Sequence, residues 1–245
     1  MSDEDRRHVV VLAPMPLEMD AITTAFGLRP ESEAAGAPWT GRVGDSEVTA
    51  IHIGMGPPLT RVATRRLFDP GAPGHRRVDH VMIAGICGGL RTDLEVGTLI
   101  NPELIVDHTS GATYRHTPPG DAPQAGKLVT TEEATLDHGL SLRFREEGFL
   151  GVDMESATVG EVCEAQGCPW SVYRCIGDRF FDGLLDERVL ALANPDGSGN
   201  AEGLAQLLAD EPEIADKLTR LAHDTSLAAR LAAEAAARGC LALDG

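Results

Sequence analysis

Four ionic side chains, far apart along the 245-residue chain, have the types that acid–base chemistry requires: Glu18, Glu155, Arg174 and Asp178. Three of them fall in one stretch, GVDMESATVGEVCEAQGCPWSVYRCIGD, which begins at Gly151. A carboxyl group positioned beside a reacting atom typically contributes about 10²–10⁴-fold to a rate. If these side chains converge on one cavity, they form a candidate catalytic site.

The end of this stretch, residues 170–177, predicts a strand that carries charge on an apolar face. Successive side chains of a strand alternate between its two faces. Arg174 and Asp178 therefore share a face with three large apolar residues, Trp170, Val172 and Ile176. A charge on such a face costs several kcal/mol unless it is paired or bound. Two interpretations stay open at this point, a structural Arg–carboxylate pair and a functional site.

The pattern VDMES…CPWSVYRCIGD resembles the signature of the nucleoside phosphorylase/nucleosidase superfamily, in particular the 5′-methylthioadenosine/S-adenosylhomocysteine nucleosidases. That family has a Val-(Glu/Asp)-Met-Glu turn, then a helix, then a strand ending Arg-x-Ile-Ser-Asp. The opening APMPLEMDAI is similar to the family's Ala-Met-x-x-Glu, and the turn Gly85–Leu90 to its Gly-x-Ala-Gly-Gly-Leu. The resemblance covers most of residues 8–178.

The resemblance implies a role for each matching position. Asp178 would protonate N7 of a purine base, and Glu18, with Arg174, would position the attacking water. Substrate contacts would come from Glu155 on the ribose hydroxyls, Met154 beneath the sugar, the backbone of Val152 at the base, and Cys87 and Gly88 in the glycine turn. Cys87 is not favoured as a nucleophile, because no sequence neighbour would lower its pKa.

The implied activity is hydrolysis of the N-glycosidic bond of a purine nucleoside, such as methylthioadenosine or S-adenosylhomocysteine. Water is favoured over phosphate because Arg174 is the one obvious cation and Glu18 would repel a dianion. Gly177 stands where the family has Ser, and VTTEEATLDHG lacks an aromatic that stacks on adenine in relatives. Three alternatives stay open: a futalosine-type hydrolase, an adenosylhopane-type phosphorylase, and a non-catalytic nucleoside-binding protein.

Composition excludes several other classes of function. A formal charge of -17 argues against partners such as nucleic acid or an anionic membrane surface. The five cysteines form no C-x-x-C pair, which indicates reduced, buried thiols and no metal site. Gly54-x-Gly56 lacks the third glycine of a dinucleotide fingerprint, so no cofactor is expected. The acidic and basic N-terminus and the lack of a long apolar run predict a cytoplasmic protein.

The elements that must position these side chains indicate one α/β domain over residues 8–240, after a disordered tail at 1–7. Strands are predicted at 8–13, 46–53, 78–90, 127–131 and 170–177. Helices are predicted after Pro16, over 60–67, over 133–145 and from a first turn that contains Glu155, with a loop at 194–200. The resemblance implies a central twisted mixed sheet with helices on both faces, followed here by a helical C-terminal tail. It also implies a homo-oligomer, with a dimer favoured.

Overall fold

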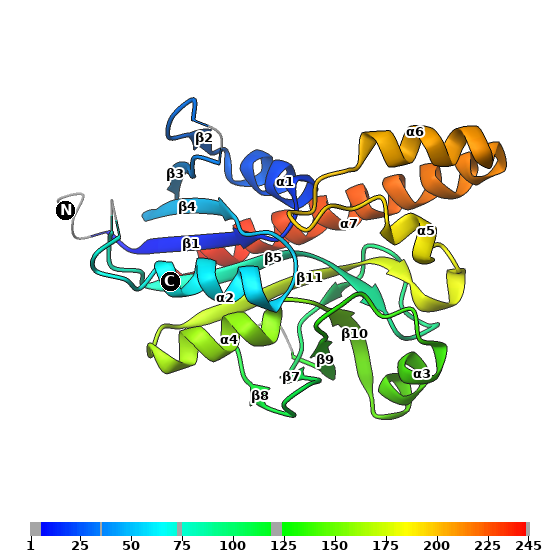
Figure 1. The fold of residues 1–245 in the computed structure, drawn as a ribbon. Helices are drawn as coiled ribbons and strands as arrows, with labels where there is room; N and C mark the ends of the chain where they lie inside the picture. Colours follow the sequence, from blue (N-terminus) through cyan, green and yellow to red (C-terminus); the bar gives the residue numbers. More distant parts are fainter. Residues whose placement is uncertain (1–5, 35, 73–74, 119–123, 244–245) are drawn as a thin grey trace.

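A mixed β-sheet runs through the centre of the molecule (Figure 1). The structure is a computed structural model that describes residues 6–34, 36–72, 75–118 and 124–243. Its strands are β1 His8–Ala13, β2 Arg29–Pro30, β3 Trp39–Val43, β4 Ser46–His52, β5 His80–Gly89, β6 Leu99–Ile100, β7 Leu104–Asp107, β8 Thr113–Tyr114, β9 Lys127–Thr130, β10 Phe149–Asp153 and β11 Trp170–Arg179. They follow the order β2-β3-β4-β1-β5-β10-β9-β7-β8, with β11 paired to β5 and β6.

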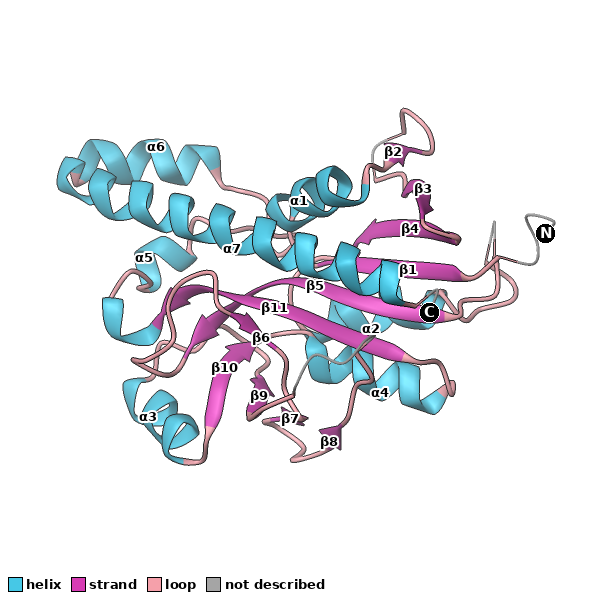
Figure 2. Ribbon diagram, turned by 180° about the vertical axis from the view of Figure 1, so that it is seen from behind, coloured by secondary structure: helices cyan, strands magenta, loops and turns pink. Residues whose placement is uncertain are grey.

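Helices cover both faces of this sheet (Figures 1 and 2). They are α1 Pro16–Phe26, α2 Pro57–Arg66, α3 His138–Glu146, α4 Ser156–Ala165, α5 Glu187–Leu190, α6 Ala201–Asp210 and α7 Ala215–Ala242, with 3₁₀ turns η2 Phe180–Asp182 and η3 Pro212–Ile214. Helices α1 and α7 lie on one face, where Ile22 and Ala236 join a core with Val9 and Val11. Helix α4 lies on the opposite face, where Val159 and Cys163 pack with Val10 and Leu12, and α2 packs against α4.

Strand β5 exchanges one neighbouring strand for another near its carboxyl end, and the candidate site lies at this point. Over its first residues, as far as Ile83, it pairs with β1 on one side and β11 on the other, both parallel to it. At Gly88 the strand β10 has taken the place of β1, so that Val152 of β10 pairs on one side and Asp178 of β11 on the other. A Cβ at position 88 would lie 3.2 Å from Val152 Cγ1 and 3.8 Å from an Asp178 carboxylate oxygen. Glycine therefore keeps these two neighbours close together.

The predicted fold class is confirmed, a mixed sheet flanked by helices and ending in a long C-terminal helix. The helix predicted over 133–145 was wrong at its start, since α3 begins at His138 after the N-cap Asp137. The Asp137 carboxylate accepts the amides of Gly139 and Leu140, which fixes that start. Helix α6 was not anticipated.

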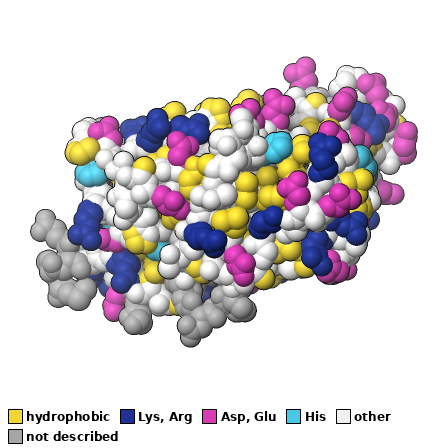
Figure 3. All heavy atoms as spheres, turned by 90° about the horizontal axis from the view of Figure 1, so that it is seen from below, with side chains coloured by type: hydrophobic (Ala, Val, Ile, Leu, Met, Phe, Trp, Pro, Cys, Tyr) yellow, Lys and Arg dark blue, Asp and Glu magenta, His cyan; other side chains and the backbone are white. Residues whose placement is uncertain are grey.

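The predicted tail at residues 1–7 lies mostly outside the described residues. The carbonyl of Arg7 accepts the amide of Glu47, so the described chain is tied to the sheet from this residue onward. Among the described residues, no helix combines the length and the apolar composition needed to cross a membrane. The face seen in Figure 3 carries hydrophobic side chains in its middle, with acidic and basic side chains interspersed around them.

Candidate active site

A cavity of about 230 Å³ lies at the carboxyl ends of several strands of the sheet. Its wall is formed by residues that follow β1 and β4 and by residues at the ends of β5, β10 and β11. In open α/β sheets this edge is where ligands bind, because the loops that leave the strands meet there. The cavity brings together three carboxylates that are distant in sequence: Glu18, Glu155 and Asp178.

Arg174 lies behind this wall and holds three carboxylates at once. Its Nε donates to Asp153 at 2.9 Å, one terminal nitrogen to Glu155 at 2.7 Å, and the other to Glu18 at 3.4 Å. All four side chains are almost completely buried. A buried guanidinium needs such partners, because leaving its charge uncompensated costs several kcal/mol. Arg174 therefore does form a structural ion pair with carboxylates, as one interpretation of the sequence held. Those carboxylates themselves face the cavity.

Backbone amides complete the positioning of Glu18. One of its oxygens accepts the amide of Met15 at 2.8 Å, and the other accepts the amide of Ile86 at 2.7 Å. The first bond also caps the start of α1, so Glu18 has the helix-terminal role that its position indicates. A Cβ at Gly85 would overlap the Glu18 carboxylate, so this position requires glycine.

Glu155 is fixed between β4 and β11. One carboxylate oxygen accepts the Gly56 amide at 2.8 Å, and the other accepts Arg174. The turn Gly54-x-Gly56, which resembles a dinucleotide fingerprint only weakly, thus presents an amide to a carboxylate. Gly56 has φ of +84°, a conformation that a side chain would strain. Because Glu155 is the N-cap of α4, the sequence-based placement in the first turn was off by one residue.

Asp153 is the site residue that sequence analysis missed. Its carboxylate accepts the Thr130 hydroxyl at 2.7 Å, the Ser156 amide at 3.1 Å and the Ser156 hydroxyl, in addition to Arg174. It therefore links β9, β10, β11 and α4 at one point. The signal that could have found it is the first acidic residue of Val-Asp-Met-Glu, which lies on a strand otherwise rich in apolar residues.

Burial sets the protonation of these carboxyl groups. Burial raises the pKa of Glu18 to about 7, against the opposing pull of Arg174 and the Ile86 amide. Burial likewise raises the pKa of Glu155, and the charge of Asp153 adds to this. Burial alone would lower the pKa of Arg174, but Asp153, Glu155 and Glu18 outweigh it and raise that pKa. The guanidinium thus stays charged, whereas Glu18 exchanges a proton near neutral pH.

Asp178 lies in a different environment, next to Gly88 on β5. Within the described chain, its carboxyl accepts no hydrogen bond, and burial raises its pKa to about 7, with a smaller contribution from Asp182. A β-bulge between Ile176 and Asp178 interrupts the alternation of faces assumed from the sequence. Asp178 faces the cavity nonetheless. A half-buried carboxyl with this pKa is able to hold a proton at pH 7 and to donate it.

Gly177 occupies the bulge for a steric reason. A Cβ at this position would lie 3.1 Å from Ile86 Cβ and 3.2 Å from Ile86 Cδ1, which is closer than normal packing. Ile86 in turn packs with Cys175, Ala228 and Ala232, of which the alanines belong to α7. The close contact between β11 and β5 therefore favours Gly at position 177, where the family has Ser.

An aromatic group does reach the cavity, but from a segment that the sequence did not indicate. Phe180 of η2 lines the cavity together with His138 of α3, and their ring centroids are 4.5 Å apart. Leu90, Leu136 and Leu185 add apolar surface to the same wall. An aromatic ring thus lines the cavity from a position two residues after Asp178.

Seven of the eight predicted site residues line this one cavity: Glu18, Cys87, Gly88, Val152, Met154, Glu155 and Asp178. Arg174, predicted to contact water or substrate, lies behind the carboxylates instead. Burial raises the pKa of the Cys87 thiol well above its ordinary value, which keeps it a thiol. In the described part of the chain, no cluster of three or more His, Cys, Asp or Glu residues is arranged to hold a metal ion.

Comparison with known proteins gives the family. The model of the phosphorylase superfamily matches residues 8–147, which is more than half of the chain. The chain belongs to the phosphorylase superfamily. A 5′-methylthioadenosine/S-adenosylhomocysteine nucleosidase of Chromohalobacter salexigens is 22% identical over 206 residues, covering 70% of this chain and 84% of the relative. A futalosine hydrolase of Streptomyces coelicolor is 26% identical over 197 residues, with coverage of 70% and 83%.

Solved structures of this superfamily share the fold. The 5′-methylthioadenosine/S-adenosylhomocysteine nucleosidase of Helicobacter pylori superposes with a TM-score of 0.69 at 17% identity, covering 96% of this chain and 97% of that one. The futalosine hydrolase of the same organism gives 0.67 at 16% identity, with 97% of each chain covered. At such identities the likeness establishes the architecture, and the chemistry of this superfamily member rests on its own cavity.

Proposed function

We propose that this protein is a nucleosidase that hydrolyses the N-glycosidic bond of a purine nucleoside. The observation that carries the proposal is the convergence of Glu18, Glu155 and Asp178 on one cavity, with Arg174 fixing the first two from behind. The matched nucleosidases and futalosine hydrolase support the same reaction class. Breaking the C1′–N9 bond requires charge to be neutralised on the base, a cationic sugar to be stabilised, and a nucleophile to be delivered.

Asp178 supplies the acid for the leaving base. Its pKa of about 7 leaves a large protonated fraction at neutral pH, which is the requirement for a general acid. In the proposed pose the base lies between the backbone of Gly88 and Val152 and the ring of Phe180. As the C1′–N9 bond breaks, its electron pair moves to the base, and the Asp178 proton goes to N7.

Glu155 and Glu18 serve the sugar and the water. Glu155 uses one lone pair of each oxygen for Gly56 and Arg174, so its remaining lone pairs are free for the ribose 2′- and 3′-hydroxyls. Its negative charge also favours the developing cation. Glu18 accepts a proton from water as the water oxygen bonds to C1′. The reaction thus consumes one water and releases the free base and the free sugar.

The charges around the cavity favour water over phosphate as the nucleophile. Phosphorolysis requires donors for a dianion, but the three donor groups of Arg174 already bind carboxylates. Arg179, at the cavity wall, donates to Asp182 and Glu95. Glu18, when ionised, would repel phosphate where the nucleophile must approach.

The candidate substrates within this class differ in the substituent at the 5′ position of the ribose. Methylthioadenosine and S-adenosylhomocysteine are the first candidates, because the relatives that act on them cover most of this chain. Met15 and Met55 line the cavity beside Glu18 and Gly56, and their thioethers suit an apolar 5′ substituent. Futalosine is the second candidate, because the matched Streptomyces enzyme is a futalosine hydrolase.

The test is a panel of nucleosides incubated with the protein, with and without phosphate. Methylthioadenosine, S-adenosylhomocysteine, futalosine, adenosine and inosine are analysed for the free base by chromatography and for the sugar product by mass. We expect free sugar from at least one substrate, at a rate that phosphate does not change, and release that is about 10²–10⁴-fold slower with Asp178→Asn. Sugar 1-phosphate as the product would show phosphorolysis, and binding of a nucleoside without any turnover would show a non-catalytic protein.

Two further properties stay predictions. Assembly as a homodimer is expected from the family resemblance, and sedimentation equilibrium would test it. Residence in the cytoplasm would be tested by cell fractionation.

A further inference from the structure

The loop at residues 194–199, which the proposed chemistry does not use, touches the cavity from outside. It forms a tight turn, in which the Asn194 amide donates to the Ser198 carbonyl at 2.8 Å and the Gly197 amide donates to the Asn194 carbonyl at 2.8 Å. Asp196 accepts the Ser198 amide at 2.9 Å, which stiffens the turn. A rigid turn is able to transmit its position to whatever it contacts.

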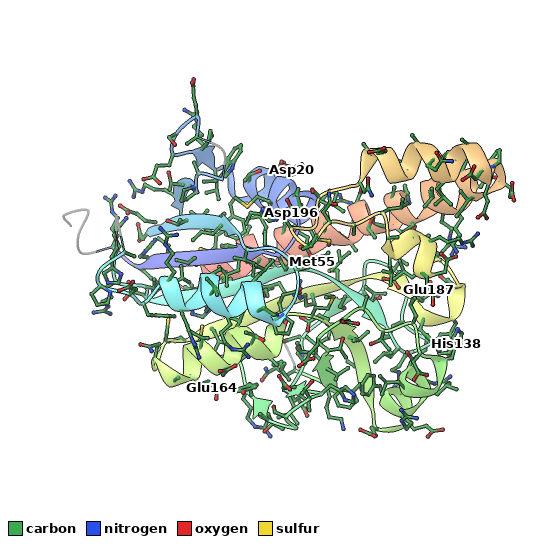
Figure 4. All side chains as sticks on the ribbon, in the orientation of Figure 1. Asp20, Met55, His138, Glu164, Glu187 and Asp196 are labelled. Atoms are coloured by element: carbon green, nitrogen blue, oxygen red, sulfur yellow. The ribbon has the colours of Figure 1, made fainter. Side chains whose placement is uncertain are left out.

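The turn contacts the two methionines that line the cavity. The carbonyl of Pro195 accepts the Met55 amide at 3.1 Å, and Figure 4 shows Asp196 beside Met55, whereas His138 lies well away from both. Gly197 packs on Met15 so closely that a Cβ there would lie 2.6 Å from Met15 Cγ and 3.0 Å from Met15 Cα. A hydrogen bond between His52 Nε2 and the Asp196 carbonyl, 2.8 Å long, ties the same turn to the end of β4.

Met15 connects this turn to the proposed chemistry, because its amide donates to Glu18 at 2.8 Å. We propose that the 194–199 turn is a clamp on the segment after β1, with Gly197 as a positioning residue that sets Glu18 through the backbone of Met15. The same clamp holds Met55, whose neighbour Gly56 donates to Glu155. One turn thereby sets both carboxylates on the sugar side of the cavity. The inference rests on the proposed nucleosidase function.

The test compares two glycines of one turn. Gly197 has φ of +77° and contacts Met15, whereas a Cβ at Gly199 would meet nothing within 4 Å. Gly197→Ala is expected to lower kcat/KM at least tenfold, chiefly through kcat, because Met15 must shift and Glu18 loses a well-placed donor. Gly199→Ala is expected to match the parent. His52→Ala, which removes only the exposed tie, should give a smaller loss in the same direction.

A pH profile separates positioning from general damage. The groups that face Glu18 are Arg174 from β11, Glu155 from the turn before α4, and the amides of Met15 and Ile86. Since the Met15 bond lowers the pKa of Glu18, losing it moves the acidic limb of kcat/KM to higher pH in Gly197→Ala. An activity loss with an unchanged limb would contradict the clamp.

Amide hydrogen exchange at Met15 tests the clamp without any substrate. We expect faster exchange of this amide in Gly197→Ala than in Gly199→Ala, with equal exchange in β1. Equal rates for Met15 in both variants would overturn the inference even if the parent hydrolyses nucleosides. If the parent releases no base from any nucleoside, the proposed function fails, while the exchange data still decide whether the turn holds Met15.

Discussion

Glu18, Asp153 and Glu155 surround Arg174 with hydrogen bonds, whereas Asp178, near the end of β11, has no side-chain partner among the described residues. The first region is almost completely buried and Asp178 is half-buried, and both contain carboxyl groups with raised pKa values. In the first region fixed donors hold each oxygen in one geometry. In the second, apolar surroundings disfavour charge and nothing fixes the proton.

This difference teaches how one cavity can divide its work. Side chains that must bind hydroxyls and orient water need fixed geometry, which the Arg174 network gives. A side chain that must give up a proton needs an accessible pKa more than a fixed partner, which burial gives to Asp178. In the proposed mechanism the cavity therefore has an ordered side for the sugar and the water, and a proton-exchanging side for the base. Substitutions at four positions test this division.

The largest effect is expected from removing the cation of the ordered side. Arg174→Met leaves three buried carboxylates without their shared partner, and breaking such a network typically costs about 3–5 kcal/mol. We expect loss of activity and a large drop in the urea midpoint. The matched control is Arg61→Met, which breaks the partly exposed pair with Glu161 and should cost about 0–1 kcal/mol. Similar costs for both variants would show that the Arg174 network is not special.

Asp178→Asn tests the proton-exchanging side through the rate. Asparagine keeps the size of the side chain but carries no acidic proton, so kcat should fall by about 10²–10⁴-fold. In the parent, kcat/KM should fall above pH 7 as Asp178 loses its proton, and below pH 7 as Glu18 gains one. A narrow maximum near neutral pH is the expected profile. An unchanged basic limb in Asp178→Asn would remove Asp178 from the mechanism.

The same variant tests the division through stability. Since burial raises the pKa of Asp178 in the folded state to about 7, its contribution to stability is full below its ordinary pKa near 4 and is lost as pH rises through 7. Asn is neutral at all pH values. At pH 8 the free energy of unfolding of Asp178→Asn should therefore exceed that of the parent by on the order of a few kcal/mol, seen as a higher urea midpoint. This gain should vanish near pH 4; a gain that does not depend on pH would argue against a buried, titrating carboxyl.

Phe180 should affect binding more than chemistry. Stacking of a base on an aromatic side chain is worth about 1–3 kcal/mol when tested by alanine substitution. Phe180→Ala is therefore expected to raise KM roughly 5–150-fold while kcat changes less. Phe181→Ala is the matched control, because its neighbouring ring is exposed and does not line the cavity. Equal effects of the two substitutions on KM would show that Phe180 is not the base platform.

Much of this site could be predicted from the sequence, because charged residues stand at positions where apolar residues are expected. Arg174 on an apolar strand and Glu155 in the Val-Asp-Met-Glu motif both indicated a site, and Arg174 donates to both Glu155 and Glu18. Hydrophobic patterns likewise predicted β1, β4, β5, β9 and β11, but not β10, which carries Asp153. Asp153 was missed because β10, the apolar strand that buries it, was not predicted.

Other features depend on contacts that no local pattern encodes. The bulge at Gly177 follows from the approach of Ile86 on β5. Phe180 reaches the cavity because η2 turns back towards His138 of α3, more than 40 residues earlier in the chain. The 194–199 turn was predicted as a loop, but its contact with Met15 crosses most of the chain.

The smallest effect is expected at Gly177, where the protein departs from the family pattern. Adding a Cβ there crowds Ile86. Overpacking of this kind typically lowers the free energy of unfolding by about 1–3 kcal/mol. Gly177→Ala and Gly177→Ser should therefore lose similar stability, since both add that atom. Comparing their kcat/KM isolates the hydroxyl, and we expect less than a tenfold difference because Asp178 needs no fixed partner to exchange its proton. A much faster Ser variant would show that the proton-exchanging side also depends on fixed geometry, and the contrast with the Arg174 network would then be one of degree.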